Sequence, residues 1–192
     1  MCKQRSLPRH YHEFDVFVSS DEQRADIRKW IMTTLIPMLQ REGIRVYVPM
    51  ISLPLGAIRS EETERIIRKC HTFLVILSDG YFEDGSIWTS FEWKAVWKRF
   101  YSTQNLDIVL VNFDLLDKAD ISDRPTKALL NLGYAIEFHN QSGDIHDKIK
   151  RRIRRSDFKE TSRGRFRYKQ NLDEDWELVK MNECTPLLLD EN

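Results

Sequence analysis

The sequence has few cysteines, few glycines and no long apolar run. Its three cysteines, Cys2, Cys70 and Cys184, are widely separated and lack zinc-binding spacing, which is typical of a reducing compartment. Its seven glycines form neither a dinucleotide-binding fingerprint nor a phosphate-binding P-loop. The longest apolar runs, 73–77 and 108–111, are far shorter than the roughly 20 residues that cross a bilayer. We therefore expect either a cytoplasmic protein or the cytosolic part of a membrane receptor, which composition does not separate.

The sequence also lacks net charge, with 30 basic and 30 acidic residues. The two signs nevertheless separate near the end: residues 148–169 hold eleven basic and two acidic residues, and residues 170–192 hold seven acidic and one basic. A basic segment of this kind can bind anionic lipid or nucleic acid, but it is also typical of a solvated helix end, which we favour. No nucleic-acid-binding motif accompanies it, so we expect no nucleic-acid partner. We expect a membrane contact only if the chain is a receptor tail.

Short β-rich runs alternate with helical patterns along most of the chain. Strands are expected at 14–19, 44–48, 73–77, 108–113 and 134–138. Five helices are expected: after Ser20, after Ser60, after Ser86, over 126–132 and around 145–153. The three serines are expected to cap their helices, and Gln23 completes a capping box with Ser20. The first of these helices is expected to be interrupted near Pro37. This alternation predicts an α/β fold, a flavodoxin-like three-layer sandwich with a five-stranded parallel sheet in the order 2-1-3-4-5.

The histidines and acids form no motif that indicates a resident metal or cofactor. The five histidines lack metal-ligand spacing apart from a weak His10-x-His12 pair, and no serine, histidine and aspartate can be assembled into a triad. We therefore expect no metal site and no bound cofactor.

One loop is unusual because residues 49–58 contain no charge. This uncharged segment lies between the second expected strand and the next helix, at the edge of the sheet where ligands and partners meet parallel strands. Its Pro54 and Gly56 restrict its shape. Such a segment either folds onto its own domain or offers an apolar surface to another protein. Both alternatives stay open.

A second feature is the pair Trp88 and Glu92, which are four residues apart and therefore share one face of a helix. An indole ring beside a carboxylate can stack a nucleotide and stabilise a cationic transition state of glycosidic cleavage. Ordinary packing explains the same two residues equally well.

These features together resemble the Toll/interleukin-1 receptor (TIR) domain family over roughly 13–155. The run 14–19 is similar to the family's first box, and the uncharged segment lies where its BB loop lies. The spacing from Gly56 to Ser78 is that of Toll-like receptors, and Trp88 with Glu92 resembles the signature of the third helix. The resemblance implies a cytosolic innate-immune signalling module with other TIR domains, self and adaptor, as partners. It places the contact at the BB loop, in Ile51, Leu53, Pro54, Leu55 and Gly56.

The chain also departs from the family pattern. The usual Arg-Asp of the BB loop is replaced by Ile51-Ser52, the third-box Phe-Trp falls on Ile145-His146, and Ser20 replaces an aromatic residue that often follows the first box. Electrostatic pairing through the loop is therefore not expected.

Some TIR domains cleave NAD, and the resemblance gives this chain an alternative function as an NAD glycohydrolase. Glu92 is then the catalytic carboxylate, and Trp88 and Ser19 border the nucleotide. We favour the scaffold over the enzyme, and a cleft between Ser19, the loop and Glu92 would favour the enzyme.

We expect an N-terminal arm over 1–12, the TIR domain over 13–155, and a flexible tail, basic then acidic, over 156–192.

Overall fold

The computed structural model describes residues 13–82, 87–103, 106–138 and 144–158, with the side chains of 103 and 154–158 left aside. Its strands are β1 (Val16–Ser20), β2 (Val46–Tyr47), β3 (Thr72–Leu77), β4 (Asp107–Asn112) and β5 (Ala135–Glu137). All pairings are parallel, in the order β2-β1-β3-β4-β5. The predicted sheet and its strand order are confirmed. The predicted N-terminal arm and almost all of the predicted tail lie outside the described residues.

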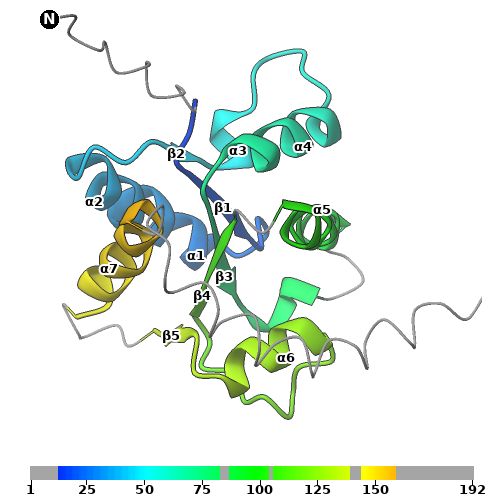
Figure 1. Ribbon diagram of the computed structural model, residues 1–192, viewed down its shortest axis with the longest axis vertical. Coiled ribbons are helices and arrows are strands. Elements are labelled where there is room, and N and C mark those ends of the chain that lie inside the picture. The colour runs from blue at the N-terminus through cyan, green and yellow to red at the C-terminus, as the bar shows by residue number, and fades with distance from the viewer. Residues whose placement is uncertain (1–12, 83–86, 104–105, 139–143, 159–192) are drawn as a thin grey trace, which may run out of the picture.

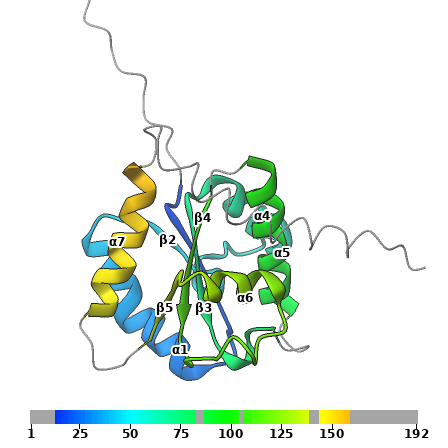
Figure 2. The ribbon, with the colours of Figure 1, turned by 60° about the horizontal axis from the view of Figure 1, so that its bottom comes forward.

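Helices cover both faces of this sheet. They are α1 (Ala25–Trp30), the π-helix η1 (Ile31–Leu35), α2 (Ile36–Arg41), α3 (Pro49–Ser52), α4 (Arg59–Lys69), the 3-10 helix η2 (Asp79–Phe82), α5 (Ile87–Thr103), α6 (Arg124–Asn131) and α7 (Asp144–Phe158). Helices α1, α2 and α7 lie on one face, and α4, α5 and α6 lie on the other (Figures 1 and 2). The predicted three-layer sandwich is confirmed.

The alternation of side chains along each strand supplies a core on each side of the sheet. Phe17 and Phe73 point to the α4–α5 side, where their rings stack with centroids 5.2 Å apart. Their neighbours Val18 and Leu74 belong to the core on the α1–α7 side. Because both faces are covered, β3 is buried at all six positions, which explains its unbroken apolar run.

The first helix does not begin where its capping motif predicts. Ser20 is the last residue of β1, and α1 begins only at Ala25. The Asp21 carboxylate instead accepts a hydrogen bond from the Gln23 N–H at 2.9 Å, which turns the chain between the strand and the helix. The predicted capping box is wrong because the strand continues through Ser20.

Two further predictions about helices need correction. Helix α4 begins at Arg59 rather than after Ser60, and no side chain caps its N-terminus. The chain is helical without a break from Ala25 to Arg41, so no helix ends at Pro37. The proline, which has no N–H to donate to the turn before it, directly follows the wide turn of η1. The predicted cap Ser86 lies outside the described residues.

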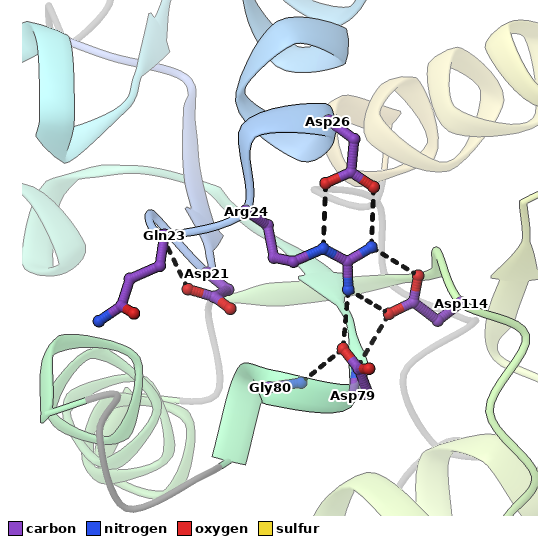
Figure 3. Close-up of polar contacts among 7 residues, drawn as sticks. All are labelled: Asp21, Gln23, Arg24, Asp26, Asp79, Gly80 and Asp114. Atoms are coloured by element: carbon purple, nitrogen blue, oxygen red, sulfur yellow. Dashed lines mark hydrogen bonds and ion pairs between the residues drawn. The ribbon is translucent and has the colours of Figure 1, made fainter.

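An arginine joins three loops at the carboxyl ends of the strands (Figure 3). Arg24 donates to Asp26, Asp79 and Asp114 over 2.7–3.1 Å. The Asp79 N–H also donates to Asp114 at 3.0 Å. Burial raises the pKa of Asp114, but the hydrogen bonds from Arg24 and Asp79 outweigh it and lower that pKa. This network fixes η2, which begins at Asp79.

Candidate functional site

Glu92 is a buried carboxylate that faces β1. It lies in the second turn of α5 and is only 2% exposed. Its Oε2 accepts a hydrogen bond from the Ser19 hydroxyl at 2.5 Å, and Ser19 is fully buried in β1. Ser19 Oγ also lies 2.7 Å from the Tyr81 hydroxyl. Since serine has one proton and gives it to Glu92, Tyr81 is the donor to Ser19.

Tyr81 reaches this site because η2 is held at both ends. The Arg24 network fixes Asp79, and the Thr89 hydroxyl on α5 donates to the Tyr81 carbonyl at 2.6 Å. Burial, followed by the charge of Glu92, raises the pKa of Tyr81 well above its ordinary value. Tyr81 therefore stays a hydrogen-bond donor at all physiological pH values.

Arg59 covers the other oxygen of Glu92. Its guanidinium donates to both oxygens of Glu22, at 2.9 and 2.5 Å, and to Glu92 Oε1 at 3.3 Å. The central carbon of the Arg59 guanidinium lies 4.3 Å from the ring centroid of Trp88, in a cation–π contact. Trp88 is 39% exposed and therefore forms the rim of this cluster, with Glu92 at its base.

The charge state of Glu92 is set by opposing effects. Burial raises its pKa to about 7, although the hydrogen bond from Ser19 and the charge of Arg59 both lower it. Burial alone would lower the pKa of Arg59, but its contacts with Glu22 and Glu92 raise it, so Arg59 stays protonated. The site therefore holds one fixed cation and one carboxylate that titrates near neutral pH.

The uncharged segment begins at the buried Pro49 and runs to an exposed tip around Leu55. Its first residues form α3, where Pro49 is buried and the Ser52 hydroxyl accepts a hydrogen bond from the Val48 N–H at 3.1 Å. Leu55, at the tip, is fully exposed. Gly56 follows it with a φ of +81°, which favours glycine. Each alternative drawn from the sequence thus describes one part of the segment.

The exposed part carries most of the residues that the resemblance implies for a contact. Ile51, Leu55 and Ile58 are exposed apolar side chains, and Pro54 and Gly56 are exposed with them. Leu53 is only partly exposed. Ile58 directly precedes Arg59, so the apolar tip and the cover of Glu92 are neighbours in the chain.

Comparison with family models decides the family, because residues 16–153 match the model of the TIR domain. The chain belongs to the TIR domain family. Among solved structures, the TIR domain of the Toll-related receptor TRR-2 from Hydra magnipapillata is 17% identical with a TM-score of 0.54, and the match covers 73% of this chain and 98% of that one. The TIR domains of the activated Roq1 resistosome are 24% identical with a TM-score of 0.50, over 74% of this chain and 80% of theirs. No curated protein sequence matches significantly.

These matches agree with the sheet order and confirm the resemblance drawn from the sequence. At such identities the solved structures establish the fold of this TIR domain and nothing finer. Within the described residues, no helix combines the length and the apolar composition needed to span a bilayer.

The structure brings three of the residues predicted for the site into one cluster. Ser19, Trp88 and Glu92 come from separate segments, and contacts through Glu92 and Arg59 join them. Neither Arg59, which covers the carboxylate, nor Glu22, which binds Arg59, was predicted from the sequence. The available signal was the position of Arg59, the first charge after thirteen uncharged residues, 46–58. The space beside Glu92 that would indicate an enzyme is occupied by the guanidinium of Arg59.

Proposed function

We propose that this TIR domain is an innate-immune-type signalling module that assembles with other TIR domains through the tip of the uncharged segment. The observation that carries the proposal is the full exposure of Leu55, flanked by exposed Ile51 and Ile58. An exposed apolar cluster on a loop of fixed shape is typical of a protein contact. The Roq1 TIR domains were solved within an activated resistosome, and this supports a signalling role through assembly here.

Leu55→Glu tests the loop, and Leu115→Glu is the matched control because Leu115 is an exposed leucine in the β4–α6 connection. Burial of one leucine contributes about 2 kcal/mol, so its replacement by a charge should weaken association roughly 30-fold or more. Sedimentation equilibrium over a wide concentration range measures this change. If both substitutions weaken association equally, or if neither weakens it, the loop is not the contact.

A second candidate function is cleavage of NAD, favoured by the cluster of Ser19, Trp88 and Glu92. In that reaction the bond between the nicotinamide nitrogen and the ribose breaks, and nicotinamide leaves with the electron pair. Water then adds to the ribose carbon and releases one proton to solvent. The Glu92 carboxylate would stabilise the positive charge that develops on the ribose. Because Arg59 covers this carboxylate, we rank the function second.

Nicotinamide release by the wild type and by Glu92→Gln tests this second candidate. Crowded and concentrated samples should be included, because assembly is the proposed active condition. Release that is lost in Glu92→Gln would establish the enzyme. If the wild type associates in these samples but releases no nicotinamide, Glu92 has a structural role.

A further inference from the structure

A chain of hydrogen bonds leads away from the Glu92 carboxylate toward the surface of the molecule. The Tyr81 hydroxyl donates to Ser19 Oγ over 2.7 Å, and the Ser19 hydroxyl donates to Glu92 Oε2 over 2.5 Å. All three residues are at most 2% exposed, so solvent offers the two hydroxyls little alternative. A serine hydroxyl that accepts one hydrogen bond still has a single proton to give. By donating to Ser19, Tyr81 keeps that proton directed at the carboxylate.

Tyr81 owes its position to anchors outside its own short helix. The helix η2 has four residues, too few to hold itself in place through internal hydrogen bonds. At its first residue, the Asp79 carboxylate accepts a hydrogen bond from Arg24 at 2.7 Å, and the Asp79 N–H donates to Asp114 at 3.0 Å (Figure 3). The location of the Tyr81 hydroxyl therefore depends on the network that begins two residues before it.

Arg24 is the cation of that network and joins three loops. Its guanidinium donates to Asp26 through Nε and Nη2, to Asp114 through Nη1 and Nη2, and to Asp79 through Nη1 (Figure 3). Such a planar fork fixes direction as well as distance, which a lysine ammonium does not. The side chains of Asp26 and Asp79 are 55% and 68% exposed, so the network faces solvent. The helix η2 thus connects an ion network at the surface to a buried carboxylate.

We propose that Arg24 is a positioning residue for the buried carboxylate of Glu92. It acts through two hydroxyls that it does not touch, those of Tyr81 and Ser19. While the Arg24 network holds η2, Tyr81 keeps the Ser19 proton on Glu92 and favours the charged carboxylate. Loss of the network removes this support, and Glu92 then binds a proton more readily. The proposal concerns the charge of Glu92 alone and rests on neither function proposed above.

Other charged groups near Glu92 are not part of this route. Arg59 of α4 contacts its Oε1 at 3.3 Å and lowers its pKa, whereas the charge of Glu22 raises it. Tyr47 of β2 also feels the charge of Glu92, but burial raises the pKa of Tyr47 to about 12, which keeps it neutral. Since Glu22 lies two residues from Arg24, the test must separate an effect through Glu22 from one through η2.

The pKa of Glu92, followed by carbon-13 NMR of its carboxyl group, is the readout. Tyr81→Phe removes only a hydroxyl and should raise this pKa above about 7, with a roughly threefold or greater fall in the acid dissociation constant. Arg24→Ala should change the pKa in the same direction. Arg28→Ala, which removes an exposed arginine of α1, is the matched control and should leave the pKa unchanged.

A double-variant cycle separates the proposed route from a direct effect of charge. In the Tyr81→Phe background, Arg24→Ala should have no further effect on the pKa of Glu92. Arg24→Lys keeps the positive charge but cannot join the carboxylates as a fork, so it should behave like Arg24→Ala. If Arg24→Ala does not fold, Arg24→Lys carries the same cycle.

The proposal is overturned if Tyr81→Phe leaves the pKa of Glu92 unchanged, or if the Arg24 variants do so. It is also overturned if Arg24→Ala acts equally with and without the Tyr81 hydroxyl, because its effect then comes from charge or from Glu22. A wild-type pKa in Arg24→Lys would likewise assign the effect to charge and not to position. Because the measurements use dilute protein without NAD, their failure is distinct from a failure of assembly or of NAD cleavage.

Discussion

The pKa of Glu92 makes the stability of this TIR domain depend on pH in a direction opposite to that of most carboxylates. Its pKa is about 7 in the folded chain against an ordinary value of 4.5, because burial disfavours the charged form. The folded chain therefore binds more protons at this residue than the unfolded chain between pH 4.5 and 7. Stability from this group is fully present below pH 4.5 and is lost as the pH rises through 7.

The size of this effect follows from the difference between the two pKa values. Each pH unit is worth about 1.4 kcal/mol, so ionisation of Glu92 lowers the free energy of unfolding by about 3 kcal/mol from pH 4 to pH 8. Carboxylates whose pKa is lowered, such as Asp15 and Glu62, act in the opposite direction. Their contribution is common to the wild type and to Glu92→Gln and cancels when the two are compared.

Urea denaturation of the wild type and Glu92→Gln from pH 4 to pH 8 measures this difference directly. We expect Glu92→Gln to gain about 3 kcal/mol relative to the wild type across that range, mostly between pH 4.5 and 7. Glu61→Gln, at an exposed position of α4, controls for the loss of one acidic residue. A difference that stays within about 0.5 kcal/mol at every pH would refute the reasoning, because Glu92 would then not change its charge state in this range.

Three further predictions test the elements that hold the site. Ser19→Ala should raise the pKa of Glu92 above about 7, since it removes a hydrogen bond that stabilises the carboxylate, and carbon-13 NMR of the glutamate carboxyl measures that pKa. Arg24→Ala should lower the free energy of unfolding by about 1–2 kcal/mol, with a smaller loss at high salt, because it leaves Asp79 and Asp114 without their cation. Gly56→Ala should cost about 1 kcal/mol through its φ of +81° alone, since no atom lies within 4 Å of the added methyl group; an unchanged urea midpoint would contradict this.

The fold was predictable because its signals are local and repeated. Each strand carries its own apolar run, and the covered strand β3 is marked by apolar residues at consecutive positions 73–77. Helix starts were less predictable, as Ser20 illustrates. A serine followed by a glutamine three residues later satisfies the capping pattern, yet Ser20 pairs with Ile76 in the sheet. Tertiary pairing decided the outcome, and the sequence pattern contains no information about it.

The site was only partly predictable because its contacts are distant in sequence. Glu92 and Trp88 are visible as a pair on one helical face, but Ser19 lies 73 residues from Glu92 and Arg59 lies 37 residues from Glu22. Such partners follow from the order of the strands, which brings the end of β1 beside α5. Which charged residue reaches a buried carboxylate depends on side-chain conformation, and residue type alone does not determine it.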